Sequence, residues 1–141
     1  MSSPQISGLL APIVTLNAWT FVMEFWMYRT RIPTFINLKF DNSTTKAELD
    51  AMTPPNVRWK ADNFNHLLEQ PTQFYAIALV LAVAGNDNRV DTALAWSYVG
   101  VRIVHSLVHS TSNKIMRRFG LFVISSGILA TMTARAAMLV F

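Results

Sequence analysis

Charged residues are absent from four stretches of this chain, and this pattern limits its possible folds more than any other feature. The stretches are Leu9–Met23, Leu79–Gly85, Thr92–Val101 and Phe119–Ala134. A helix needs about 20 mostly apolar residues to cross the roughly 30 Å hydrocarbon core of a bilayer. Two of the stretches reach that length only when neighbouring polar residues are included. With 52% hydrophobic and only 14% charged residues, the chain is predicted to be an all-α integral membrane protein.

The expected architecture is a single domain that forms a four-helix bundle with up-down topology. We expect helices at about 7–28, 54–84, 91–117 and 119–140, and a cytoplasmic loop at about 29–53. A length of 141 residues is typical of one domain. Thr53 followed by Pro54 indicates the start of the second helix. Pro71 inside this helix predicts a kink and frees a backbone carbonyl near Leu67, which then needs another partner.

Basic residues are concentrated in two of the connecting segments. Because cytoplasmic loops carry an excess of Lys and Arg, both segments are expected in the cytoplasm and both termini on the non-cytoplasmic side of a multi-pass protein. The first apolar run has no basic segment before it and no small-residue cleavage site after it, so we expect it to be retained. No basic patch with interleaved aromatic residues indicates a nucleic-acid partner. The basic residues are Arg29, Arg31, Lys39, Lys46, Arg58, Lys60, Lys114, Arg117 and Arg118, against Arg89 on the opposite side.

A polar stripe continues from the charged start of the second helix into its apolar part. Its members recur at steps of three or four residues and therefore share one helical face. Polar groups at membrane depth are costly, so the stripe is expected to line a site or a subunit contact. The members are Arg58, Asp62, Asn65, Glu69 and Gln73.

The third helix carries a second, cationic stripe. The spacing places Arg117 on the same side if the helix continues that far, whereas Arg118 is expected to point away. Together the two stripes suit an anionic or zwitterionic ligand whose ammonium group binds Glu69. The competing interpretation is structural: Arg102 pairs with Glu69, and the histidines hydrogen-bond between helices. The stripe consists of Arg102, His105, His109 and Asn113.

The chain contains no cysteine, so any thiol chemistry must use a thiol that a co-substrate supplies. His105 and His109 could share a metal, but no cysteine or carboxylate on their helix completes a zinc site. Haem held by two histidines needs ligands from opposing helices, and His66 is the third and last histidine. We therefore expect neither metal nor haem. Arg135, deep in the last helix, is expected to have a structural role, either snorkelling outward or pairing across subunits.

These residues resemble those of the MAPEG family, the membrane-associated proteins in eicosanoid and glutathione metabolism. The family's members, microsomal glutathione transferases among them, are four-helix proteins of about this length that assemble as trimers and bind glutathione between subunits. The resemblance covers nearly the whole chain. It rests on Asn65, Glu69, Pro71 and Phe74, on the spacing from Arg102 through His105, His109 and Asn113 to Arg117, and on the arginines that end the first helix.

The resemblance implies a role for each site residue. Glu69 would hold the amino group of glutathione, and Asn65 or His66 would stand for the family's site asparagine. His105 and His109 occupy places where better-known members carry two tyrosines that touch the ligand. The thiolate would be stabilised by an arginine, either Arg117 or, as alternatives, Arg29 or Arg31. The remaining residues expected to bind glutathione are Arg58, Gln73, Arg102 and Asn113.

The implied function is that of a membrane-embedded, glutathione-dependent transferase or peroxidase. Glutathione would be the co-substrate, and a lipophilic small molecule would arrive laterally from the membrane lipid around a homotrimer. One alternative is a non-enzymatic membrane protein that binds lipid or anions on the same scaffold, because Asp62 and His66 stand where better-known members have Arg and Asn. Another is a channel or proton relay through His105, His109 and Glu69.

Overall fold

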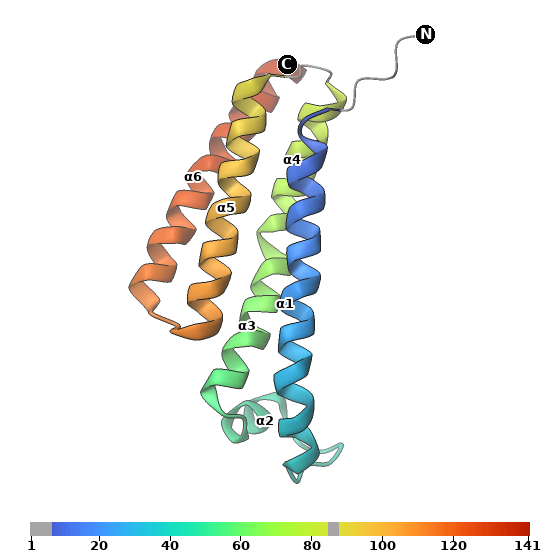
Figure 1. The fold of residues 1–141 in the computed structure, drawn as a ribbon, viewed down its shortest axis with the longest axis vertical. Coiled ribbons are helices and arrows are strands. Elements are labelled where there is room, and N and C mark those ends of the chain that lie inside the picture. The colour runs from blue at the N-terminus through green and yellow to red at the C-terminus, as the bar shows by residue number, and fades with distance from the viewer. Residues whose placement is uncertain (1–6, 85–87) are drawn as a thin grey trace.

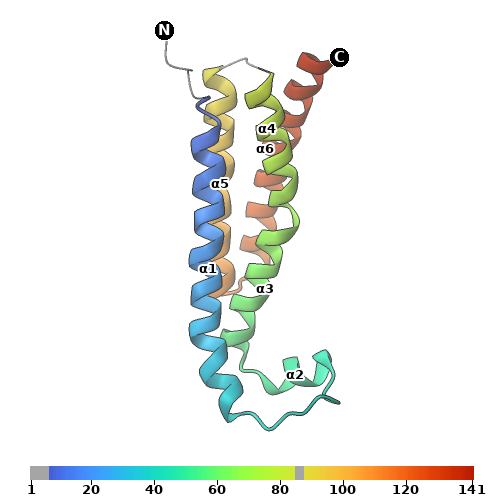
Figure 2. The same cartoon turned by 90° about the vertical axis from the view of Figure 1, so that its right-hand side faces the viewer.

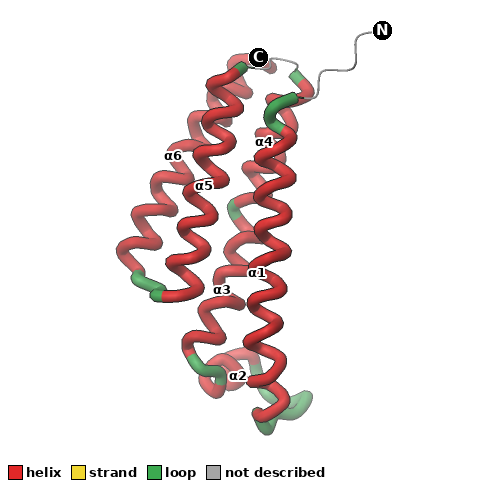
Figure 3. Tube along the Cα trace, in the orientation of Figure 1, coloured by secondary structure: helices red, strands yellow, loops and turns green. Residues whose placement is uncertain are grey.

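The computed structural model describes residues 7–84 and 88–141, and helices account for most of them (Figure 3). No strand occurs in these ranges. The α3–α4 pair stacks end to end, so that four long helical columns lie side by side (Figures 1 and 2). The start of α1 and the end of α6 lie at one end of the molecule, and α2 lies at the other. The bounds are α1 Leu10–Asn37, α2 Lys46–Met52, α3 Pro55–Glu69, α4 Pro71–Val83, α5 Arg89–Thr111 and α6 Ile115–Val140.

Two helices of the described residues are long and apolar enough to cross a membrane by length and composition. These are α1 and α6, with mean hydropathies of 1.2 and 1.6 over their most apolar windows. The other two columns, α3–α4 and α5, contain the polar stripes seen in the sequence. Their polar side chains therefore have to find partners inside the protein or at a site.

The apolar core lies where α1, α4, α5 and α6 meet. Ala78 of α4 and Ala95 of α5 are fully buried, and small side chains let helices approach closely. Phe74 stacks on Tyr98 with ring centroids 4.5 Å apart and planes 9° apart. Because both rings are fully buried, this pair fixes the rotation of α4 against α5.

The second column is interrupted as the sequence predicts. Helix α3 begins with Pro55 in its first turn, one residue after the expected start, and ends at Glu69. Helix α4 then begins with Pro71, whose ring nitrogen has no hydrogen to donate. Gln70 therefore sits at a break in the column, close to its middle.

Helix α1 extends beyond its expected end near residue 28 and continues to Asn37. Arg29 and Arg31 end the apolar run, but arginine is a good helix former and does not end a helix. The Arg31 guanidinium lies 4.7 Å from the centre of the Phe35 ring, one turn further along. The loop that was expected from about residue 29 therefore begins only after Asn37.

The short helix α2 also lies within the segment expected as a loop. The Thr45 side chain accepts from the backbone N–H of Glu48, and the Glu48 carboxylate accepts from the backbone N–H of Thr45. The hydrogen bonds from the Thr45 backbone and hydroxyl lower the pKa of the Glu48 carboxyl. These two reciprocal hydrogen bonds form a capping box at the N-terminus of α2.

Helix α5 ends before the expected residue 117. It stops at Thr111, and Asn113 adopts a left-handed conformation with φ of 46°. The backbone N–H groups of Ser112 and Asn113 both donate to the carbonyl of Val108, which closes the helix. Asparagine tolerates this conformation better than most residues. Arg117 consequently belongs to α6, which starts at Ile115.

A buried ion pair joins α5 to α6 near the end where α6 finishes. The Arg135 guanidinium donates to both carboxylate oxygens of Asp91, and the Asp91 side chain is fully buried. The prediction that Arg135 snorkels outward or pairs across subunits is therefore wrong, because its partner is Asp91 of the same chain. The contact ties the α5–α6 pair together far from the polar stripes.

We expect Arg135→Met to destabilise the protein, because it leaves the Asp91 carboxylate buried without its partner. The free energy of unfolding should fall, by less than for a fully buried pair because the Arg135 side chain is 27% exposed. Thermal melting followed by circular dichroism in one detergent measures the change. The double variant Asp91→Asn/Arg135→Met should recover most of the loss. Equal melting of Arg135→Met and the wild type would contradict a stabilising pair.

Candidate functional site

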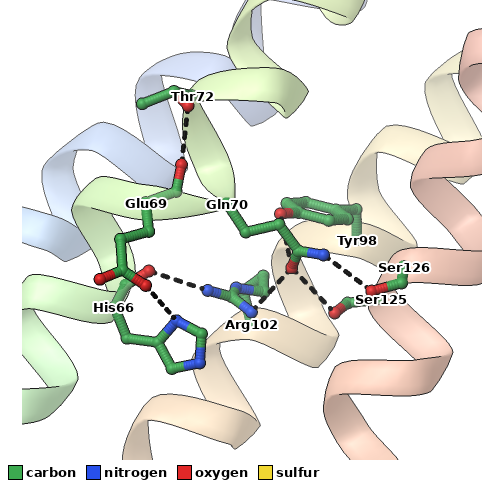
Figure 4. A network of polar contacts seen from close by, with 8 residues as sticks. All are labelled: His66, Glu69, Gln70, Thr72, Tyr98, Arg102, Ser125 and Ser126. Atoms are coloured by element: carbon green, nitrogen blue, oxygen red, sulfur yellow. Dashed lines mark hydrogen bonds and ion pairs between the residues drawn. The ribbon is translucent and has the colours of Figure 1, made fainter.

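The break between α3 and α4 is held by the guanidinium of Arg102 from α5. Arg102 is fully buried, and it donates to the Gln70 side-chain oxygen at 3.0 Å and to the His66 carbonyl at 3.3 Å (Figure 4). The sequence predicted a freed carbonyl near Leu67, and the bonded carbonyl is one residue earlier. A neighbouring helix supplies its partner, as expected for backbone at membrane depth.

Gln70 connects three columns of the structure. Its amide nitrogen donates to the Ser126 hydroxyl of α6 at 2.7 Å. Its amide oxygen accepts from Arg102 and, in longer contacts of 3.5 and 3.4 Å, from the hydroxyls of Tyr98 and Ser125 (Figure 4). Gln70 was not predicted from the sequence, because it does not lie on the helical face of the polar stripe that contains Glu69. The signal was present, since Gln70 lies one helical turn after His66 and directly before Pro71.

Among residues 7–84 and 88–141, no carboxylate is hydrogen-bonded to Arg102 to neutralise its positive charge. Both oxygens that accept from it belong to amide groups. The alternative that Arg102 pairs directly with Glu69 is wrong: within the described ranges, the Glu69 carboxylate lies beside His66 instead, with its Oε2 3.6 Å from Nδ1. The Glu69 side chain is 72% exposed. A buried cation therefore lies behind the surface that carries Glu69.

Three imidazoles form a cluster next to Arg102. The ring centre of His66 is 5.3 Å from that of His105 and 6.2 Å from that of His109, both in edge-on arrangements. Those two rings of α5 are 5.9 Å apart and nearly fully buried. Phe122 of α6 lies 5.9 Å from His66 on another side. In the part of the chain that the structure describes, no three His, Asp or Glu side chains are placed to hold a metal ion.

Arg118 faces this cluster, although the sequence predicted that it would point away. The left-handed turn at Asn113 starts a new helix, and this resets the rotation of the residues that follow. Arg118 is half-buried, and it donates to the Asn113 side-chain oxygen at 2.5 Å. Arg117 is exposed on α6. The arginine beside the histidines is therefore Arg118, whereas the helical spacing predicted Arg117.

Two pockets meet at His66 and Arg118. The polar pocket has a volume of about 340 Å³, and the apolar pocket one of about 310 Å³. Since both pockets are lined by the same imidazole and guanidinium, these two side chains lie between them. The polar pocket is lined by Asp62, Asn65, His66, Glu69, His109 and Arg118, and the apolar pocket by His66, His105, Ile115, Arg118, Phe119 and Phe122.

Other residues selected from the sequence lie outside these two pockets. Arg58 donates to the carbonyl of Asp50 at 2.9 Å, Gln73 is exposed beyond the break, and Arg29 is exposed on α1. Arg31 lines a third pocket of about 540 Å³ between α1 and α3, which Asn65 also lines. Asn65 therefore lies between Arg31 and the polar pocket.

The comparisons with known proteins identify a family. The family model described as MAPEG family matches residues 9–138 of the 141-residue chain. A search of curated proteins and a search of solved structures return no match. The matched segment contains every residue that lines the polar and apolar pockets.

We expect Gln70→Ala to loosen the contact among α3, α5 and α6. The change removes the amide that accepts from Arg102 and donates to Ser126, and leaves a buried cation with one protein acceptor. Hydrogen bonds to charged groups contribute about 1.5–3 kcal/mol, so the free energy of unfolding should fall by about that amount. Thermal melting by circular dichroism measures this. The matched control Gln73→Ala, on the exposed face, should melt like the wild type, and equal losses in the two variants would contradict the assigned role.

Proposed function

Because the match spans residues 9–138, the chain belongs to the MAPEG family of membrane-associated proteins, and from this we propose a glutathione-dependent function. The proposed reaction is transfer of glutathione to a lipophilic electrophile in the membrane, or reduction of such a molecule by glutathione. The observation that carries the proposal is the polar pocket, in which a carboxylate and a guanidinium lie beside a cluster of imidazoles.

The polar pocket holds two carboxylates, Asp62 and Glu69, and one guanidinium, Arg118, and two of these groups can pair with charges of glutathione. Glutathione carries one ammonium group, two carboxylates and a thiol on a short peptide. Glu69 provides a carboxylate for the ammonium group, while Arg118 provides a cation. Asn65, His66 and His109 can hydrogen-bond to its amide and carboxylate groups. These contacts support Glu69 as the residue that anchors the amino end.

Arg118 is the residue that we propose to stabilise the thiolate. The thiolate is the nucleophile in such reactions, and a nearby guanidinium favours it over the neutral thiol. Arginine keeps its charge at all relevant pH values and donates from a fixed fork. Arg102 adds a second positive charge from behind His66, and a region of low dielectric strengthens both effects. Arg118 takes this role in place of Arg117 because it lines the pocket.

The exposed polar face supports assembly with further copies of the chain. Asp62, Asn65, Glu69 and Gln73 are all exposed on the column formed by α3 and α4. Such a face is costly against lipid, so we propose that other subunits of a homotrimer cover it. Arg31 and Arg29 of α1 would then be available to a site completed between subunits.

The proposed orientation in the membrane follows from charge. We propose four spans, with both termini on the non-cytoplasmic side and the end that carries α2 in the cytoplasm. The polar pocket then lies toward the compartment that supplies glutathione. A protein that binds lipid or anions without turnover remains the second candidate, favoured by the pocket beside Arg31, which is lined mostly by apolar side chains.

We expect the purified protein to ionise bound glutathione at neutral pH, seen as thiolate absorbance in ultraviolet difference spectra. Arg118→Ala should lower that signal at least about tenfold, which corresponds to roughly 1.4 kcal/mol of lost thiolate stabilisation. Arg117→Ala is the matched control and should keep the signal.

The reverse result, with loss in Arg117→Ala and none in Arg118→Ala, would contradict the assignment of Arg118. Absence of thiolate in the wild type, together with no thermal shift on adding glutathione, would contradict the glutathione function itself. Saturable binding of lipid or anions without conjugation of any electrophile would favour the second candidate.

A further inference from the structure

One asparagine of α3 and two serines of α5 form a set that we call the buried polar cluster. Asn63 and Ser106 are 0% exposed, and Ser110 is 1% exposed. Both polar atoms of the Asn63 side chain and both serine hydroxyls have no hydrogen-bond partner among residues 7–84 and 88–141. Buried polar groups are hydrogen-bonded in the great majority of cases, so a group of orphaned atoms calls for a partner.

Asn63 is directed into the space between α1 and α5. Lys60, one turn before it, has its Nζ 5.1 Å from the centre of the Trp26 ring of α1. His66, one turn after it, has its ring centre 5.3 Å from that of His105 of α5. Residues three apart in a helix differ in direction by about 60°, so Asn63 lies between the direction of α1 and that of α5.

The two serines of α5 are directed into the same space. Ser106 lies seven residues after the fully buried Val99 and fourteen after Thr92, and residues seven apart share a helical face. Thr92 lies against Gly8 of α1, so this face of α5 is turned toward α1. Ser110 follows Ser106 by one turn. The adjoining face of α5 carries the two imidazoles that meet α3.

The cluster also lies at one level of the bundle. The His66 ring lies beside both imidazoles of α5. Because α3 and α5 run in opposite directions, Asn63 lies one turn closer to the α2 end, level with residues 106–110 (Figure 1). The contact between α1 and α3 described above places Met23 of α1 at the same level. Helices α1, α3 and α5 each contact the other two, so the cluster lies at their junction.

The hydroxyls of Ser106 and Ser110 are not bonded back to their own helix. Ser97 and Thr111 of α5 donate to the backbone carbonyl four residues earlier, at 2.8 and 2.6 Å. This local bond is a common partner of serine and threonine inside a helix. In the described ranges, Ser106 and Ser110 form no such bond. Their hydroxyls are therefore available to a partner in the junction.

We propose that the buried polar cluster binds water, and that this water extends to Nδ1 of His109. This nitrogen is a further buried atom with no partner in the part of the chain that the structure describes. An amide and two hydroxyls both donate and accept hydrogen bonds, as water does, and a buried water forms about three of them. The cluster itself is neutral, so it does not select an anion. Arg102, one turn before Ser106, disfavours a cation.

Bound water would make the cluster a set of positioning residues for His109. The ring of His109 lines the polar pocket. A hydrogen bond at one ring nitrogen fixes the orientation of an imidazole and determines which nitrogen carries the proton. The polar pocket thereby receives an imidazole that is held from the interior of the bundle. This role does not depend on which ligand the pocket binds.

Radiolytic footprinting of the full-length protein in detergent tests the water site directly. Hydroxyl radicals that form in a short X-ray pulse react close to the water from which they arise, and the sulfur of methionine is readily oxidised. Met23 is 0% exposed, yet mass spectrometry of peptides should find it oxidised. Met132 is the matched control, because it is equally buried but lies in the apolar core, and it should stay unoxidised. Equal oxidation of the two methionines, or none at Met23, would overturn the water site.

A double variant tests which residues hold the water. Asn63→Leu/Ser106→Ala removes the donors and acceptors of both side chains, and oxidation of Met23 should be lost. In protein labelled with ¹⁵N in its imidazoles, the Nδ1 signal of His109 should move toward that of a nitrogen without a hydrogen-bond partner. Ser97→Ala, at an exposed position of the same helix, is the control and should keep both wild-type readouts.

The outcomes separate the parts of the inference. Persistent oxidation of Met23 in the double variant would contradict the assignment to Asn63 and Ser106. Loss of that oxidation with an unchanged His109 signal would support the water site and overturn its link to the polar pocket. The comparison of Met23 with Met132 in the wild type decides the water site even if the double variant does not fold. No step uses glutathione, so the result is independent of the proposed function.

Discussion

The buried guanidinium of Arg102 is the constraint on which the arrangement of the helices depends. Removing a charge from water costs several kcal/mol unless hydrogen bonds replace the lost hydration. Arg102 finds its acceptors where the α3–α4 column is broken before Pro71, at the His66 carbonyl and the Gln70 side chain. The break, the position of α5 and the contact of Gln70 with α6 therefore require one another.

The same arrangement determines the electrostatics of the site. Because the two oxygens that accept from Arg102 belong to amide groups, its positive charge remains. Its Nε is buried and has no hydrogen-bond partner among the described residues. The positive charge of Arg102 lies at the His66 carbonyl, and Arg118 lines the polar pocket together with the His66 imidazole. Glu69 is kept apart at the exposed edge, where it can meet an ammonium group. Separated charges of this kind suit a zwitterionic ligand whose thiol must ionise.

Features that depend on local chemistry could be predicted from the sequence. Helical periodicity placed Arg102, His105 and His109 on one face, and Pro71 predicted the break. The freed carbonyl was predicted near Leu67, whereas Arg102 binds the carbonyl of His66. The rotation of one helix against another could not be predicted. Packing of Phe74 on Tyr98 turns Gln70 inward, and it leaves Glu69 outside.

The arginine at the site shows a second limit of sequence reasoning. A change of one residue in a helix rotates a side chain by about 100°, so the choice between Arg117 and Arg118 depends on where α5 ends. The left-handed conformation of Asn113 decides this, and asparagine is common enough inside helices that its presence alone did not indicate an end. The length of α1 could not be predicted in this way either, because the apolar run ends near residue 28 while the helix continues to Asn37.

The most direct measurement is glutathione thiolate absorbance at a fixed neutral pH in Gln70→Glu. This substitution keeps the shape of the side chain and places a carboxylate on Arg102, so it neutralises the buried charge without removing an acceptor. We expect the protein to melt at or above the wild-type temperature while the thiolate signal falls about tenfold, roughly 1.4 kcal/mol. Gln73→Glu adds the same charge on the exposed face and should change the signal little. An undiminished thiolate signal in Gln70→Glu would contradict the role of the buried charge.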